Sequence, residues 1–97
     1  MAIAETIELL SKKYSMSKDD FIRLGSSLAL KEKKKNFQME RFEILARYEV
    51  ETVEELKQRI KDGSVPEHPA WEDLIEIKNI EAEISEIEND IRSLQAA

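Results

Sequence analysis

The sequence contains no cysteine, only two glycines and two prolines, and no long apolar run. The lack of cysteine excludes disulfide bonds and thiolate chemistry. The shortage of glycine and proline favours long helices over a turn-rich β fold. No segment approaches the roughly 18–20 apolar residues of a membrane span, and the start, MAIAETIELL, carries acids where a signal peptide needs basic residues. We therefore expect a helical chain without a membrane segment, located in the cytoplasm.

The charge of the chain is unevenly distributed. The 97 residues are 37% charged and 41% apolar, which is typical of one small folded domain with a net charge of −6. Residues 66–97 carry nine acids and two bases, whereas residues 11–36 carry eight bases and three acids. An acidic segment and a basic segment of this kind predict either internal neutralisation or two different binding faces.

Two stretches of similar sequence, KYSMSKDDF at 13–21 and RYEVETVEEL at 47–56, are predicted to be helix corners. In each, a tyrosine is followed by an apolar residue and then by Ser or Thr ahead of acids. Ser17 and Thr52 are good N-caps, Thr52 and Glu55 have capping-box spacing, and Met16 and Phe21 have the spacing of a hydrophobic staple. With Gly63 ending one helix and Pro69 opening another, helices are predicted over about 2–14, 17–48, 52–62 and 69–95.

The first two helices are amphipathic, with one weak segment. Apolar stripes are predicted on the first helix and at both ends of the second, with KEKKKN at 31–36 as a solvent-exposed stretch between them. Gly25 predicts a kink or a close approach by another helix, because glycine is unfavourable inside a helix. The stripe residues are Ile3, Ile7, Leu10 and Tyr14, then Phe21, Leu24 and Leu28, and finally Met39, Phe42, Leu45 and Ala46.

The last helix has the spacing of a coiled-coil seam. Its apolar residues alternate steps of three and four, and isoleucine at both seam positions favours more than two strands. Flanking acids make a basic helix a better neighbour than a parallel copy, and residues 31–47 supply such a helix. We predict that this seam and the sole tryptophan form a partner or oligomer interface of Trp71, Ile77, Ile80, Ile84, Ile87, Ile91 and Leu94.

Together these patterns predict an all-α fold. The expected architecture is a long helical hairpin, or a bundle of three to four helices, with a coiled-coil-like C-terminal helix, assembled as a homo-oligomer. Trp71 has a second interpretation, in which it packs the SVPEHP loop against the bundle instead of meeting a partner.

Catalytic, cofactor-binding and metal-binding residues are not indicated. His68 is the only histidine and lacks metal-ligand spacing around it, so a loop or capping role is expected. The acidic stretch EAEISEIE lacks the Glu-x-x-His pairs of a di-metal bundle, which leaves a solvent-exposed acidic face. We therefore predict a protein that is not an enzyme and needs no cofactor.

The lysine-rich segment offers an alternative function. Side chains of Lys31, Lys33, Lys34 and Lys35 are able to contact nucleic-acid phosphates, although no aromatic residue is interleaved with them to read bases. Exposure to solvent or pairing within the chain is the competing interpretation. A helix-turn-helix with its turn at Gly25 is disfavoured, because the apolar positions that it needs fall on Ser26, Lys31 and Lys34.

The stretch ARYEVETVEEL…KDGSVPEHPAWEDLIEIKNIEAEI, within residues 42–85, resembles small helical antitoxin-like proteins of archaea and cyanobacteria. The matching positions form a pattern of helix corners: Arg47, Tyr48, Val50, Thr52, Glu54, Glu55, Leu56, Gly63, Pro66, Trp71 and Leu74. The segment 1–35 departs from the shorter members of that group. The resemblance implies a protein that neutralises a toxin partner by binding it.

The sequence thus leads to three functional hypotheses. The first is a non-enzymatic protein-interaction module, antitoxin-like in its finer form. The second is a nucleic-acid-associated helical protein that uses Lys31–Lys35. The third is a self-assembling structural bundle with no other partner.

Overall fold

The computed structural model describes residues 2–97, and within them the chain forms four α-helices and no strand. These are α1 (Ile3–Lys13), α2 (Lys18–Ala46), α3 (Val53–Lys61) and α4 (Glu67–Ala96). The all-α fold and the helical hairpin predicted from the sequence are confirmed, and each helix boundary lies within two residues of its expected position. None of these helices combines the length and the apolar composition that crossing a bilayer requires.

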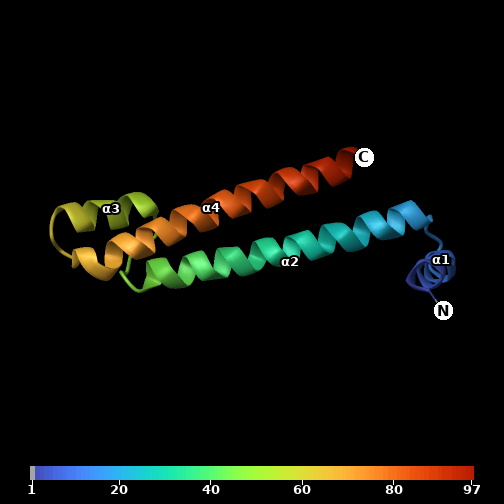
Figure 1. Cartoon of the computed structure of the whole chain (residues 1–97), viewed down its shortest axis with the longest axis horizontal. Helices are drawn as coiled ribbons and strands as arrows, with labels where there is room; N and C mark the ends of the chain where they lie inside the picture. Colours follow the sequence, from blue (N-terminus) through green and yellow to red (C-terminus); the bar gives the residue numbers. More distant parts are fainter. Residues whose placement is uncertain (1) are drawn as a thin grey trace.

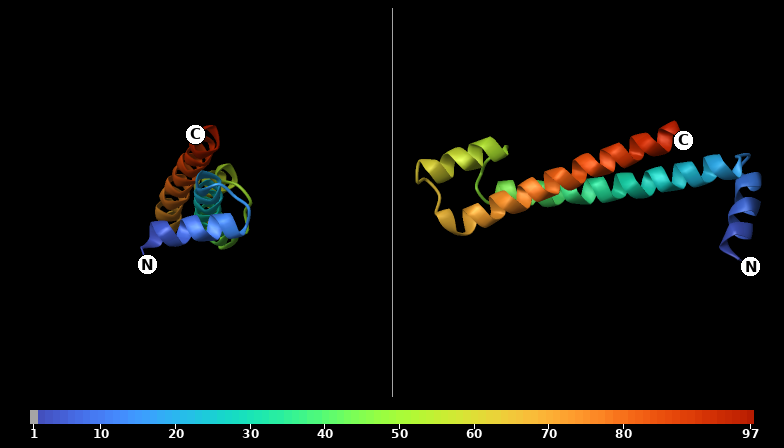
Figure 2. Two further views of the ribbon diagram at one scale, coloured as in Figure 1. Left: turned by 90° about the vertical axis from the view of Figure 1, so that its right-hand side faces the viewer. Right: turned by 45° about the horizontal axis from the view of Figure 1, so that its top comes forward.

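Helices α2 and α4 form a long antiparallel hairpin, which gives the molecule its extent of 60 × 25 × 18 Å. Helix α3 lies beside one end of this hairpin, and α1 runs across its axis at the other end (Figures 1 and 2). The main core lies at the α3 end. It consists of Ile44, Leu45, Val50, Val53, Leu56, Ile60, Ala70, Leu74, Ile77 and Ile80.

The two similar stretches of sequence form corners of the same geometry. Ser15 and Glu49, each directly after a tyrosine, have positive φ angles of 59° and 54°. The next amide, of Met16 or Val50, then donates to a carbonyl five residues back, at 2.8 and 3.3 Å. This is the Schellman arrangement that ends a helix. Gly63, with φ 77°, repeats it after α3.

The predicted helix starts are also confirmed. The hydroxyl of Ser17 accepts from the Asp20 amide at 3.0 Å, and that of Thr52 accepts from the Glu55 amide at 3.1 Å. Both bonds satisfy amides that the first turn of a helix leaves without a backbone partner. In α4 the backbone is non-helical at His68, and the His68–Pro69 peptide bond is cis, so the regular helix begins near Pro69 as expected.

One expectation for α2 is wrong. The helix passes through Gly25 without interruption, and a side chain placed there would meet nothing within 4 Å, so no other helix approaches it. Of the apolar stripes predicted on α2, Leu24, Leu28, Met39 and Phe42 are exposed, whereas Phe21 is half-buried and Leu45 is buried. The face that packs against α4 contains Leu30, Phe37 and Ile44, which are buried or half-buried.

The open surroundings of Gly25 lead to a prediction about the free energy of unfolding. Alanine there should raise the free energy of unfolding by roughly 0.5–1 kcal/mol, because it removes the entropic cost of a mid-helix glycine. The matched change Gly63→Ala should lower it by roughly 1–2 kcal/mol, because alanine resists a positive φ. Urea unfolding of both variants measures the difference, and a destabilised Gly25→Ala would contradict this account of α2.

Candidate functional site

The isoleucine seam of α4, predicted as a partner interface, lies against α2 of the same chain. Ile77, Ile80, Ile87 and Ile91 are buried there, while Ile84 and Leu94 are half-buried. Helix α2 faces the seam with alternating steps of four and three, through Arg23, Ser27, Leu30, Lys34, Phe37, Arg41 and Ile44. The seam therefore builds the hairpin, and most of its surface is already occupied within one chain.

Basic side chains of α2 meet acidic side chains of α4 along the hairpin. The Arg41 Nε atom lies 3.0 Å from Glu81 Oε2, and Lys34 Nζ lies 3.5 Å from Glu88 Oε2. Arg41 and Lys34 are seven residues apart on α2, and their partners Glu81 and Glu88 are seven residues apart on α4 in the opposite order. This is the spacing of an antiparallel heptad register. Because these pairs are partly exposed, each contributes only a few tenths of a kcal/mol, so their main effect is on register.

The lysine-rich segment is divided between several roles. Lys34 is half-buried and paired with Glu88, whereas Lys31, Lys33 and Lys35 are exposed. Lys31 and Lys35 are one turn apart and share a face of α2, but Lys33 points to a different side. The four lysines predicted to bind phosphate therefore do not form a single patch.

A polar cluster fixes α2 to the start of α4. The Tyr48 hydroxyl donates to Asp73 Oδ2, and Arg47 Nη1 lies 3.6 Å from Asp73 Oδ1. Arg59 on α3 donates to the Tyr48 carbonyl at 3.3 Å. Burial, followed by the hydrogen bond to Asp73, raises the pKa of Tyr48 to about 12. The cluster thus joins three helices at the end of the hairpin where the resemblance to antitoxin-like proteins lies.

Trp71 and His68 stand near this end of α4. Trp71 leaves 38% of its surface exposed, so it is only partly packed. His68 is exposed, with its Nδ1 atom 2.7 Å from Glu72 Oε1. Among residues 2–97, no group of three or more His, Cys, Asp or Glu side chains is placed to hold a metal ion.

The most unusual surface lies at the opposite end of the molecule. Across the part of the chain that the structure describes, seven of the eleven exposed large apolar side chains belong to α1, the corner after it and the first turns of α2. We call them the N-terminal apolar surface: Ile3, Leu9, Leu10, Tyr14, Ile22, Leu24 and Leu28. Sequence reasoning identified most of these residues as apolar stripes of the first two helices.

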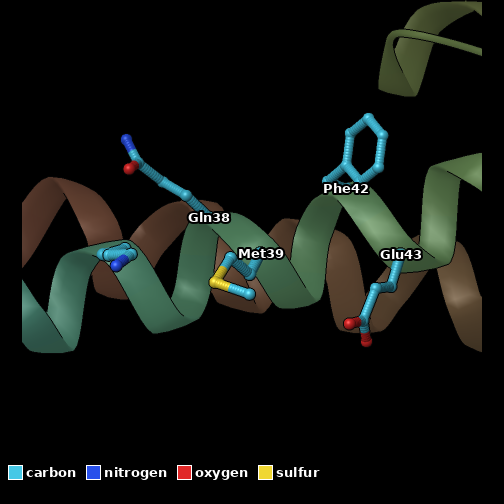
Figure 3. A pocket seen from close by; sticks show the side chains of 5 residues that line it. Gln38, Met39, Phe42 and Glu43 are labelled. Carbon is cyan, nitrogen blue, oxygen red and sulfur yellow. The ribbon is translucent and has the colours of Figure 1, made fainter.

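This surface continues along α2 as a second stripe, the α2 outer stripe. It runs through Leu24, Leu28, Lys31, Lys35, Met39 and Phe42, again in steps of three and four. Phe42 is 71% exposed and Met39 52% exposed, and they border an open pocket of about 410 Å³. Figure 3 shows Phe42 projecting from α2, with the α4 ribbon passing behind. The recurrence of these residues at steps of three and four is the sequence signal for this exposed stripe.

The model of the family described as "Uncharacterized protein MJ0235 family" matches residues 1–97. No curated protein and no solved structure matches the chain.

The Tyr48–Asp73 bond predicts a pH-dependent contribution to stability. Tyr48→Phe should lower the free energy of unfolding by about 1–2 kcal/mol near neutral pH, because Asp73 loses its hydroxyl donor. Since the pKa of Tyr48 rises from 10.0 to about 12 on folding, this contribution is full below pH 10 and is lost as the pH approaches 12. Urea unfolding across this range measures it.

The exposed Tyr14 provides the control for that experiment. Tyr14→Phe removes the same hydroxyl from a side chain that is 61% exposed, and its stability should match that of the unaltered protein. Equal stabilities of the Tyr48→Phe and Tyr14→Phe proteins at pH 7 would show that the bond to Asp73 contributes nothing.

Proposed function

We propose that this chain, which belongs to the Uncharacterized protein MJ0235 family, is a non-enzymatic protein-interaction module. The observation that carries the proposal is the N-terminal apolar surface, on which seven large apolar side chains stand exposed around one end of the hairpin. Large exposed apolar patches on soluble proteins mark sites that bind partners, and we infer that side chains of this region provide such a site. The compartment that we propose for this module is the cytoplasm.

The hairpin is suited to presenting such a surface. Its core is concentrated at the α3 end, where Leu56 and Ile77 are fully buried. The end that carries α1 has little apolar burial of its own, since Ser11 and Ser27 are the buried residues that the structure describes up to position 30. We infer that one end supplies stability and the other supplies contact with a partner.

An antitoxin-like role is the finer form of this proposal. It is supported by the resemblance over residues 42–85 and by the acidic outer side of α4. Glu76, Glu83 and Asp90 recur every seven residues and are exposed, so they form one acidic face. A basic toxin is the kind of partner that this face would attract.

Isolation of the native complex tests the interaction function. The tagged chain, purified under native conditions from cells that naturally produce it, should have a mass above 11.3 kDa at a fixed stoichiometry. Leu24→Glu should abolish the complex, because it places a charge in the contact surface. Ile75→Glu makes the same change on α4, at a similarly exposed position, and should retain it. A single free chain in every preparation contradicts the proposal.

Nucleic-acid binding is the alternative function, favoured by the exposure of Lys31, Lys33 and Lys35. If these lysines neutralise phosphates, changing all three to Gln should weaken duplex binding. The slope of log affinity against log salt concentration should then become shallower by about 0.9 for each phosphate that is no longer neutralised. As an interaction module, the protein should show no such effect.

The matched triple change for this experiment uses the exposed Lys57, Lys61 and Lys78. Titrations of a duplex at about 50 and 200 mM salt compare the two sets of variants. A weakening confined to the Lys31, Lys33 and Lys35 variant would favour the nucleic-acid alternative over the interaction module.

A further inference from the structure

We infer that α1 and the α2 outer stripe form a self-association surface whose occupant is a second copy of this chain. The inference rests on the proposed interaction function and narrows it to one partner. Its geometry is reciprocal: the α1 arm of each copy lies on the outer stripe of the other. A two-fold contact of this kind is the commonest form of homo-oligomer.

The surface area of the chain is the first argument. The chain exposes 7012 Å², whereas a compact monomer of this mass exposes about 5,700 Å². Its radius of gyration is 19.7 Å, against about 12.5 Å for a compact domain of this length. The excess of about 1,300 Å² exceeds the roughly 800 Å² that each partner hides in a standard interface. One copy therefore has enough surplus surface for a stable dimer.

The reach of α1 is the second argument. Its 11 residues span only about 16 Å at 1.5 Å per residue. Met39 lies 21 residues beyond the start of α2 at Lys18, a distance of about 32 Å along the helix. The α1 of the same chain thus cannot cover Met39 and Phe42 even if it folded back along α2. The α1 of a second copy has no such restriction.

Charge complementarity is the third argument, and it points to a second copy in particular. On α1, Leu9 is bordered by Glu5, Glu8 and Lys12 around a shallow pocket. Lys12 Nζ lies 3.8 Å from Glu8 Oε1, and Glu5 is exposed. On the outer stripe, the bases Lys31 and Lys35 stand between apolar residues. The exposed Glu5 and Leu9 of the arm therefore fit the apolar–basic stripe, and each chain carries both halves. Two copies can form the contact twice, which no partner lacking this pattern would do.

Sedimentation equilibrium of the full chain tests the inference. The expected mass is twice 11.3 kDa. Leu28→Glu should weaken dimerisation roughly tenfold or more, because it replaces an apolar contact with a charge that the interface must desolvate. Ile75→Glu is the matched control, since Ile75 and Leu28 are each 57% exposed and the charge change is identical. Circular dichroism checks that both variants keep their helices.

Cross-linking between copies provides a second measurement. The sequence has no native cysteine, so only the introduced cysteines can react. Leu9→Cys protein mixed with Met39→Cys protein should form a crossed dimer with a short bismaleimide linker. The pairing of Leu9→Cys with Ile75→Cys should form far less. Such a result, together with sensitivity to Leu28→Glu, supports the inference.

Two outcomes would overturn it. One is a monomer at every concentration, and the other is a dimer that Leu28→Glu and Ile75→Glu affect equally. Neither outcome decides the proposed function, because a native complex with a different protein would still establish an interaction module. If that complex were missing as well, both proposals would fail.

Discussion

The structure depends on the apolar seam between α2 and α4. Every other feature is placed by it: the ion pairs lie along its edge, α3 covers one of its ends, and α1 leaves from the other. The two helices contribute unequally, because α4 supplies a continuous row of isoleucines and α2 supplies a mixture of apolar, basic and small residues. The aliphatic parts of Lys34 and Arg41 can cover the α4 row while their charged ends pair with Glu88 and Glu81.

Apolar burial is graded along this seam. Near α3 the hairpin has three helices, and Leu56, Leu74 and Ile77 are almost completely buried. Towards α1 it has two helices, and Ser27 takes a seam position that a larger apolar residue could occupy. Local opening costs least where few apolar contacts are broken, so the α1 end should exchange its amide hydrogens fastest. The N-terminal apolar surface belongs to this less stable half.

The local chemistry of the sequence was sufficient for the helices. The charge pattern also predicted that residues 31–47 lie beside the last helix, as the pairs Arg41–Glu81 and Lys34–Glu88 confirm. Caps at Ser17 and Thr52 act through neighbouring residues, so sequence reasoning placed the corners correctly. The sequence did not distinguish the packed face of α2, because α2 carries two stripes with steps of three and four, and the exposed one is the more apolar. The bond between Tyr48 and Asp73 joins residues 25 apart in sequence. Such a contact depends on how the hairpin closes, which no local pattern encodes.

The antiparallel register also makes the hairpin a spacer of defined length. The pairs of Arg41 with Glu81 and of Lys34 with Glu88 are one heptad apart on both helices. Removing seven residues from each helix at the same level would shorten the rod by about 10 Å and leave the remaining faces aligned. Chains that differ by whole heptads could therefore hold the same two ends of the hairpin at different separations.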